Sequence, residues 1–427
     1  MIIYNAAVVY LPAMAVHSIF GINKHYSILL FGMLCVLYSI IGGLKAVVWA
    51  DFLQGLVMLG SVAFVAMIGT QEAGGFNELY QRSFAGGRLN VDDLFKVDLS
   101  ARHSLISTLV GGTLVYICLT SLNQIQVQRV LSLPTLRLAQ WSLVLCSLFG
   151  SIVVALSSYL GLVIYSAYGP CDPFLGGEIP RRDIILLHYV AHRLGRIPGL
   201  RGLLVAGIVS ATLSTLSSFA NSMAALALQD FVKPLHRKLY SRKFDDKQSL
   251  LLAKTLTGVF GVLCVLLAYV IERLNSRILQ SCFALLGAIG VPFLVAFVLG
   301  IYTKFTNSKG ILTAMILSIS FGVYVTFMQA FVVAALEPNA IVYHNQQCPF
   351  VYNKTLDSTE LSTSILNWSS SELVETGSTE AKGFQLAETS YLILPIMQFA
   401  VVLVVAPVVS LLTGGSRQKV PDEYVVG

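Results

Sequence analysis

Seven hydroxyl side chains gather within one short stretch of the chain, Ser210-Ala-Thr-Leu-Ser-Thr-Leu-Ser-Ser-Phe-Ala-Asn-Ser222. If this stretch is helical, Ala211, Ser214 and Thr215 stand at positions i, i+3 and i+4 and share one face. Two hydroxyl oxygens and the Ala211 carbonyl would then converge on one place beside the helix. Sodium is a hard, monovalent cation that binds several oxygens and does not require a carboxylate, so this pattern favours a sodium site. Close packing of membrane helices, which small Ser and Thr side chains permit, is the alternative explanation.

Two other segments place polar groups inside apolar surroundings. In the first, Gly111-Gly112-Thr113 precedes Asn123-Gln-Ile-Gln-Val-Gln-Arg129. A glycine pair in a membrane helix marks either an unwound point that faces a ligand or a close helix contact. We expect Arg129, near a helix end, to anchor that end at the membrane interface.

In the second segment, Asp51 lies within an apolar run, where a carboxylate is costly unless it is paired or hydrated. Lys45 is its expected partner in one interpretation, and a place on an ion path is the other.

The composition places these residues in a membrane. The chain has 427 residues, of which 56% are hydrophobic and 12% are charged, with a mean hydropathy of +0.75. A soluble domain would carry about twice that charged fraction. The sequence contains no P-loop, GxSxG or HExxH motif, and its seven His are dispersed. We therefore expect no enzyme activity, no organic cofactor, no nucleic-acid partner and no metal other than sodium.

Ten apolar segments are each long enough to cross a bilayer, which takes about 20 residues. The predicted spans are 1–19, 26–44, 46–69, 103–123, 140–166, 201–229, 250–271, 277–301, 308–335 and 389–413. Nothing alternates as barrel strands do, and backbone in lipid must satisfy its own hydrogen bonds. The chain is therefore predicted to be an all-α polytopic membrane protein with ten transmembrane helices. They form one transmembrane domain, 1–413, followed by a short polar tail, 414–427.

The connecting segments indicate an orientation. Segment 231–249 carries six Lys and Arg, which favours the cytoplasmic side. Segment 336–388 contains two glycosylation sequons, at Asn353 and Asn367, which places it outside. With ten spans, both termini then lie in the cytoplasm. Cys171 and Cys348 fall in two predicted outer loops and form a candidate disulfide.

Four segments resemble, in the same order, landmarks of the sodium/solute symporter family. They are GGLKAVVWADFLQ (42–54), GGTLVYICLTSLNQIQVQRVLS (111–132), YGPCDP (168–173) and SATLSTLSSFANSMAALALQDFVKP (210–234). The resemblance covers essentially the whole chain and is strongest to the iodide, monocarboxylate and multivitamin branch. It implies a core of two five-helix inverted repeats. This chain would supply the last ten of the branch's usual thirteen helices, so that the five-plus-five core is incomplete and its first helices are lacking.

The resemblance also implies roles for individual residues. Ala211, Ser214 and Thr215 match the contribution of the eighth core helix to the family's sodium site. The expected substrate-pocket residues are Tyr116, Thr120, Phe293 and Phe297. The expected residues of the ion path or inner gate are Asp51, Ser217, Ser218, Asn221 and Asp230. Thr120 departs from the aromatic residue often found at its place, which leaves the substrate open.

The implied function is sodium-coupled symport of a small organic anion, such as a monocarboxylate or a vitamin, across the plasma membrane. Sodium is the coupling ion, and the partners are the solute and membrane lipid. The alternative is a truncated, non-transporting membrane protein that modulates full-length relatives, because half of the family's sodium site would be missing.

Overall fold

The computed structural model describes residues 2–89, 95, 104–169, 172–174, 176–179, 182–240, 244–272, 278–332 and 390–414. Every regular element within these residues is a helix, as the sequence predicts. Seven helices are long and apolar enough to cross a membrane, or eight if one bent pair counts as a single span. Two shorter apolar helices, Tyr4–Phe20 and Gly287–Tyr302, accompany them. A helix satisfies its own backbone hydrogen bonds, which is the requirement that lipid imposes.

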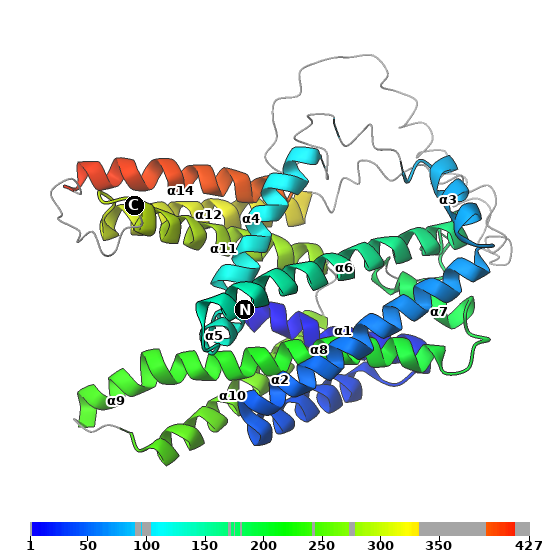
Figure 1. Ribbon diagram of the computed structural model, residues 1–427, viewed down its shortest axis with the longest axis horizontal. Coiled ribbons are helices and arrows are strands. Elements are labelled where there is room, and N and C mark those ends of the chain that lie inside the picture. Colours follow the sequence, from blue (N-terminus) through cyan, green and yellow to red (C-terminus); the bar gives the residue numbers. More distant parts are fainter. Residues whose placement is uncertain are drawn as a thin grey trace, which may run out of the picture.

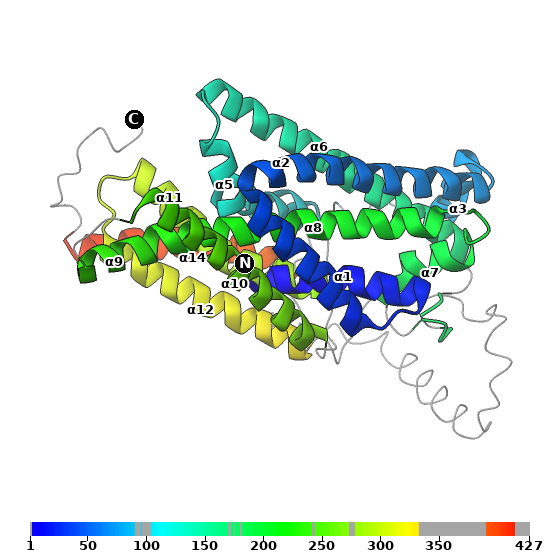
Figure 2. The ribbon, with the colours of Figure 1, turned by 90° about the horizontal axis from the view of Figure 1, so that it is seen from below.

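The larger group of helices is built around α8 (Leu200–Leu226). Figure 2 shows α8 between α2 (Lys24–Glu72) and α1 (Ile2–Phe20), and α10 (Asp246–Glu272) packs on all three. Leu216 and Phe219 of α8 lie in the buried cluster that joins these helices. α6 (Leu136–Tyr168) packs on α2 and exposes many large apolar side chains, as a lipid-facing helix does.

α2 combines two of the predicted spans, 26–44 and 46–69. The break between them lies at Gly43, whose φ of 61° and ψ of −167° are not helical. Glycine adopts a positive φ without the steric cost that a Cβ imposes, so Gly43 permits this break. The two halves, Lys24–Gly43 and Ala46–Glu72, each qualify as a membrane span.

The predicted span 103–123 is interrupted in a way that the sequence did not reveal. A π-helical turn (η2, Ser107–Gly111) leads into α4 (Gly112–Ile117) and a second π-helical turn (η3, Cys118–Leu122). The chain then bends by 52° into α5 (Gln124–Leu131). The bend lies at Asn123, which has an extended ψ of 116° and caps α5 by accepting a hydrogen bond from the Ile125 amide at 3.1 Å.

Neither glycine of the pair is an unwound point, and Gly111 alone makes a close contact. Gly111 and Gly112 both have helical backbone angles. A Cβ added to Gly111 would stand 1.8 Å from the carbonyl oxygen of Leu392, whereas a Cβ on Gly112 would meet nothing within 4 Å. The interpretation of this pair as a ligand-facing break is corrected, and close packing is the one that holds.

This difference predicts opposite effects of the same substitution at neighbouring positions. Gly111→Ala should destabilise the protein by about 1–3 kcal/mol, because the backbone of Leu392 must move to admit the methyl group. Gly112→Ala should be neutral or stabilising by up to about 1 kcal/mol, because alanine is the better helix former. The melting temperature of each purified variant measures this. Equal melting temperatures would contradict the close contact.

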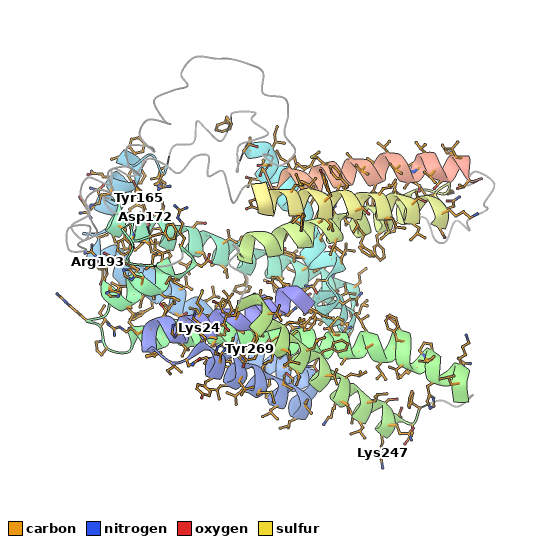
Figure 3. All side chains as sticks on the ribbon, turned by 180° about the vertical axis from the view of Figure 1, so that it is seen from behind. Lys24, Tyr165, Asp172, Arg193, Lys247 and Tyr269 are labelled. Atoms are coloured by element: carbon orange, nitrogen blue, oxygen red, sulfur yellow. The ribbon has the colours of Figure 1, made fainter. Side chains whose placement is uncertain are left out.

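Three short helices lie within segments predicted to be loops. α8 continues through a π-helical turn (η5, Ala227–Val232) into α9 (Lys233–Tyr240), so the predicted loop 231–249 begins as helix. α3 (Phe76–Ala85) lies between the predicted spans 46–69 and 103–123. α7 (Ile185–His192), which is preceded by a 3₁₀ turn (η4, Arg182–Ile184), lies between the predicted spans 140–166 and 201–229. Figure 3 places Arg193, just after α7, at one end of the larger group and Lys247, near the start of α10, at the other.

A second group contains α11 (Ile278–Tyr302), α12 (Ser308–Val332) and α14 (Ile393–Leu412), which run side by side in Figure 1. The fully buried Gln398 of α14 ties the three together. Its amide nitrogen donates to the carbonyl oxygens of Ala288 at 2.8 Å and Ser318 at 3.0 Å. Hydrogen bonds of this kind compensate for burying an amide in an apolar core.

Candidate functional site

The predicted sodium-binding face of α8 is the less covered side of that helix. Ala211, Ser214 and Thr215 are half-buried, whereas Thr212 and Leu216, on the other side, are buried. The Thr215 hydroxyl donates to the Ala211 carbonyl oxygen at 2.9 Å. Because its proton is directed into the helix, the lone pairs of the Thr215 oxygen point outward. This is the orientation that a hydroxyl needs in order to bind a cation.

Other hydroxyls of the same stretch are buried in helix packing. Thr212 donates to the Val8 carbonyl of α1 at 3.2 Å, and the fully buried Ser217 donates to the Ser214 carbonyl of its own helix at 3.1 Å. The Tyr38 hydroxyl of α2 donates to the Leu213 carbonyl at 2.8 Å. The two explanations of the hydroxyl-rich stretch thus apply to different residues. Close packing accounts for Thr212 and Ser217, and a ligand-binding role remains for Ser214 and Thr215.

Asp51 and Arg129 form a partly buried ion pair, which lies one helical turn from the predicted sodium-binding face of α8. Ser218 follows Ser214 by four residues, so it lies on the same side of α8, about 6 Å further along the axis. Its hydroxyl donates to Oδ2 of Asp51 at 3.1 Å, and the guanidinium of Arg129 donates to both Asp51 and Ser218. The Asp51 side chain is 11% exposed and that of Arg129 is 32% exposed. The cluster joins three elements: α2, α5 and α8.

The partner of Asp51 differs from the expected one. The sequence suggested Lys45, but the structure pairs Asp51 with Arg129; the Lys45 side chain lies outside the described residues. Arg129 is thus engaged by a carboxylate, whereas its place near a helix end suggested only an anchor at the membrane interface. The bend at Asn123 directs α5 back against α8, where the Gln128 amide donates to the Ser222 carbonyl at 3.3 Å. A carboxylate inside an apolar run needs a cation, and that requirement was the one available signal for Arg129.

Two oxygens beside the ion pair have no hydrogen-bond partner among the described residues. They are Oδ1 of Asp51 and Oε1 of Gln54, which lies three residues further along α2. Both atoms are buried, and a buried acceptor without a partner is costly. Unpaired oxygens of this kind are natural contacts for a cation or for the water that accompanies it.

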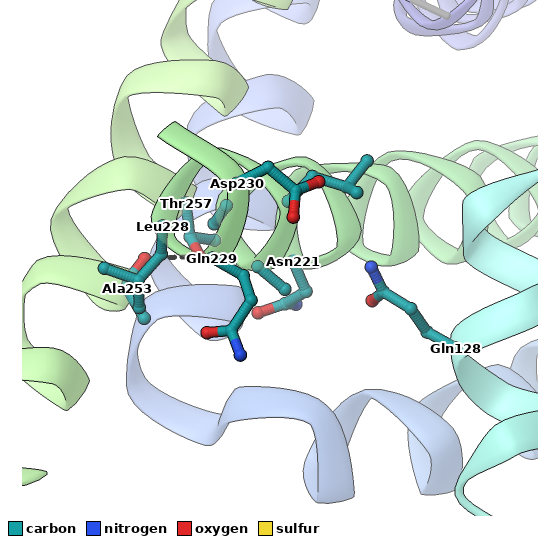
Figure 4. Close-up of a pocket in the computed structure, with 10 residues that line it drawn as sticks. Gln128, Asn221, Leu228, Gln229, Asp230, Ala253 and Thr257 are labelled. Carbon is teal, nitrogen blue, oxygen red and sulfur yellow. Dashed lines mark hydrogen bonds between the residues drawn. The ribbon is translucent and has the colours of Figure 1, made fainter. Parts of the chain in front are cut away.

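A cavity of about 480 Å³ lies on the other side of the ion pair from Ser214 and Thr215. Asn221 and Asp230, both predicted from the sequence, line it together with Gln128 of α5 and Thr257 of α10. Figure 4 shows Gln128 directed toward Asn221 across this space. The Asn221 amide donates to the Ser217 carbonyl at 2.9 Å. Of the predicted ion-path residues, Ser218 and Asn221 therefore lie on one side of α8, Asp51 contacts Ser218 from α2, and Asp230 follows in η5. Ser217 is buried in helix packing.

The four predicted substrate residues form two pairs. Tyr116 and Thr120 come from α4 and η3, and Phe293 and Phe297 from α11. Tyr116, Phe293 and Phe297 are exposed, and the Thr120 hydroxyl donates to the Tyr116 carbonyl at 2.9 Å. The Cys118 side chain, which lies between the first pair in sequence, contacts α11 at Gly290. None of the four lines the cavity beside Asn221 and Asp230 or the cavity between α9 and the start of α10.

Several predictions fall on residues that the structure does not describe. These are the sequons at Asn353 and Asn367, the disulfide between Cys171 and Cys348, and most of segments 336–388 and 414–427. Among the described residues, no group of three or more His, Cys, Asp or Glu could hold a metal ion.

The sequence of this chain is similar to one protein family and to several known proteins. The profile of the sodium:solute symporter family matches residues 1–318. A candidate sodium-dependent multivitamin transporter from Drosophila melanogaster is 34% identical over 77% of this chain and 54% of its own length. The sodium-coupled monocarboxylate transporter 1 of Homo sapiens is 30% identical over 100% of this chain and 68% of its own length. The human sodium/iodide cotransporter is 33% identical over 73% of this chain and 48% of its own.

The first of these relatives is thus matched over about half of its length. Among solved structures, a sodium-coupled sialic acid symporter, captured in a substrate-bound outward-open state, has a TM-score of 0.69 to this chain. The match covers 96% of this chain and 72% of that one, at 18% identity. At this low sequence identity, the similarity is evidence for a shared fold only.

Proposed function

The chain belongs to the sodium:solute symporter family, and on this premise we propose that it takes part in sodium-coupled symport of a small organic anion. The named relatives carry monocarboxylates, iodide or vitamins, which supports an anionic or vitamin-like solute. The family consists of transporters, and sodium is its coupling ion. Sodium entry supplies an electrical free energy of about 2.3 kcal/mol per charge per 100 mV, which is enough to concentrate a solute.

We propose that the bent pair and the two shorter apolar helices complete ten membrane spans, organised as part of a five-plus-five inverted-repeat core. The bend at Asn123 supports this, because broken helices at the centre of the membrane are characteristic of such transporters. The basic segment 231–249 would lie in the cytoplasm with both termini, and Asn353 and Asn367 would be glycosylated outside. A Cys171–Cys348 disulfide and a plasma-membrane location belong to the same proposal.

The sodium site would be formed by Ser214, Thr215 and the Ala211 carbonyl. The observation that carries the proposal is that the Ala211 carbonyl and the Ser214 and Thr215 hydroxyls share one side of α8 and belong to half-buried residues. Three oxygens do not replace the hydration shell of sodium, so further oxygens must come from another part of the assembled transporter. In this arrangement, sodium binding would draw together the elements that surround this face.

The Asp51–Arg129 pair would serve as the inner gate. It lies between the proposed sodium ligands and the cavity lined by Asn221 and Asp230, so an ion leaving Ser214 and Thr215 meets Asp51 next. Arg129 neutralises Asp51 and occupies the passage while the gate is closed. Displacement of α5 would release Asp51 to the ion, and its unpartnered Oδ1 is available for that contact.

Tyr116, Thr120, Phe293 and Phe297 are proposed to face the solute. The two aromatic side chains of α11 are separated by one turn and are both exposed, which suits an apolar wall beside a solute path. Identification of the solute requires transport measurements. Cells expressing the chain should take up one of labelled pyruvate, iodide or biotin faster in sodium than in choline. Surface-expressed protein that takes up none of the three under either condition would contradict the proposed substrate class.

A further inference from the structure

The chain carries a second cavity, of about 620 Å³, which the proposed transport path does not use. It lies where α9 meets the start of α10, and its lining includes Lys233, Arg237 and Lys238 together with Phe244 and Asp246. His236 of α9 stacks on Phe244, which lies just before α10, with ring centroids 3.9 Å apart. Cationic side chains are therefore gathered around a hollow rather than dispersed on a surface.

The described residues leave the charge of this cavity largely without acidic partners. Lys233 donates to Oε1 of Gln229 at 2.9 Å, which is a neutral partner. Within the part of the chain that the structure describes, no ion pair joins Arg237 or Lys238 to an acidic side chain. Asp246 also lines the cavity, so three cations face one carboxylate. Lys247 points outward at the same end of the molecule (Figure 3).

The neighbouring face of the same helix is apolar and exposed. Phe231, Leu235 and Leu239 follow one another at four-residue intervals and are 72%, 58% and 66% exposed. Their spacing puts them on one side of η5 and α9, away from Lys233 and Arg237. A helix that is apolar on one side and basic on the other, directly after a membrane span, is suited to the boundary between acyl chains and headgroups.

We propose that this cavity binds the headgroup of an anionic phospholipid that carries phosphate monoesters, with its acyl chains lying along Phe231, Leu235 and Leu239. Arg237 would bind a phosphate through two parallel hydrogen bonds, and Lys233 and Lys238 would act as point charges. A cluster of Lys and Arg immediately beyond a span on the cytoplasmic side is the sequence feature expected of such recognition. The volume exceeds that of a single phosphate, which favours a polyphosphorylated headgroup.

The inference rests on the proposed cytoplasmic placement of α9 but not on transport, so it is tested without solute or sodium. The purified full chain in a neutral detergent is titrated with dioctanoyl phosphatidylinositol bisphosphate. The double variant Arg237→Gln/Lys238→Gln should bind about 30-fold more weakly. The matched control is Arg137→Gln/Lys309→Gln, which removes one Arg and one Lys at exposed positions outside the cavity. Its affinity should change by less than about twofold.

Three results would overturn the proposal. The first is unchanged binding by the cavity variant, and the second is an equal loss in the control, which would indicate unspecific charge attraction. The third is binding of free inositol trisphosphate or inorganic phosphate as tightly as the lipid, which would show that the apolar face contributes nothing. A thermal melt of both double variants confirms that each is folded. A transport failure with intact lipid binding would contradict the proposed function alone.

Discussion

Arg129→Gln should destabilise the protein by about 3 kcal/mol, because it leaves the Asp51 carboxyl group without its partner in a largely buried position. Asp51→Asn should cost less. Arg129 is the more exposed partner and can turn toward solvent, whereas the Asp51 side chain is only 11% exposed. The double variant Asp51→Asn/Arg129→Gln should recover most of the loss, since a neutral amide pair can hydrogen-bond in the same place. Melting temperatures of the purified variants measure all three.

The control for this cycle is Arg137→Gln, which removes an exposed Arg at the first turn of α6 and should leave stability within about 0.5 kcal/mol of the native protein. A gate role adds a second expectation. The double variant should be folded yet leak sodium in the absence of solute, because no ion pair then closes the passage below Ser218. Strictly additive losses in the double-mutant cycle would show that Asp51 and Arg129 do not interact.

Ser214→Ala and Thr215→Ala should each raise the half-saturating sodium concentration for uptake by about 10-fold or more. Each removes one oxygen from a cation, and a hydrogen bond or similar polar contact with a charged group contributes about 1.5–3 kcal/mol. Thr215→Ser should behave nearly as the native protein, because it keeps the hydroxyl. Initial uptake rates over a range of sodium concentrations, at constant ionic strength, provide the measurement.

Thr255→Ala is a matched control for Thr215→Ala. The Thr255 hydroxyl donates to the Leu251 carbonyl at 3.0 Å, four residues earlier in α10, which reproduces the bond from Thr215 to Ala211. Both substitutions therefore delete the same kind of bond within a helix. If Thr255→Ala impaired sodium dependence as much as Thr215→Ala, the effect would arise from the helix and not from a sodium ligand.

The helices were largely predictable from the sequence, whereas their breaks were not. Apolar runs of about 20 residues locate membrane helices because lipid leaves the backbone no other partner. One break, at Gly43, falls at the junction of the predicted spans 26–44 and 46–69, and its positive φ favours glycine. The bend at Asn123 could not be predicted, because an N-cap residue and an ordinary polar residue cannot be told apart in the sequence. The glycines at positions 111 and 112 suggested an unwound point, although the backbone there is helical. Close packing against Leu392 and unwinding both favour glycine, so the sequence could not separate them.

The candidate site was predictable along one helix and not between helices. Ala211, Ser214, Thr215 and Ser218 share a side of α8 because helical spacing alone decides which residues are neighbours. The contact between Asp51 and Arg129 joins residues 78 positions apart, and it depends on the bend that turns α5 toward α8. The cost of an unpaired carboxylate in an apolar run predicts a cation near Asp51, but it does not distinguish Lys45 from Arg129.

The most direct test of the central claim is solute accumulation by the purified chain in proteoliposomes. Equal gradients of sodium or choline are applied, with the interior held negative by a potassium diffusion potential. Our account predicts that the transported solute accumulates above its equilibrium level only with the inward sodium gradient, and that Ser214→Ala/Thr215→Ala abolishes this accumulation while Thr255→Ala preserves it. Equal accumulation in sodium and choline, or none in either by folded protein, would contradict sodium-coupled symport by this chain.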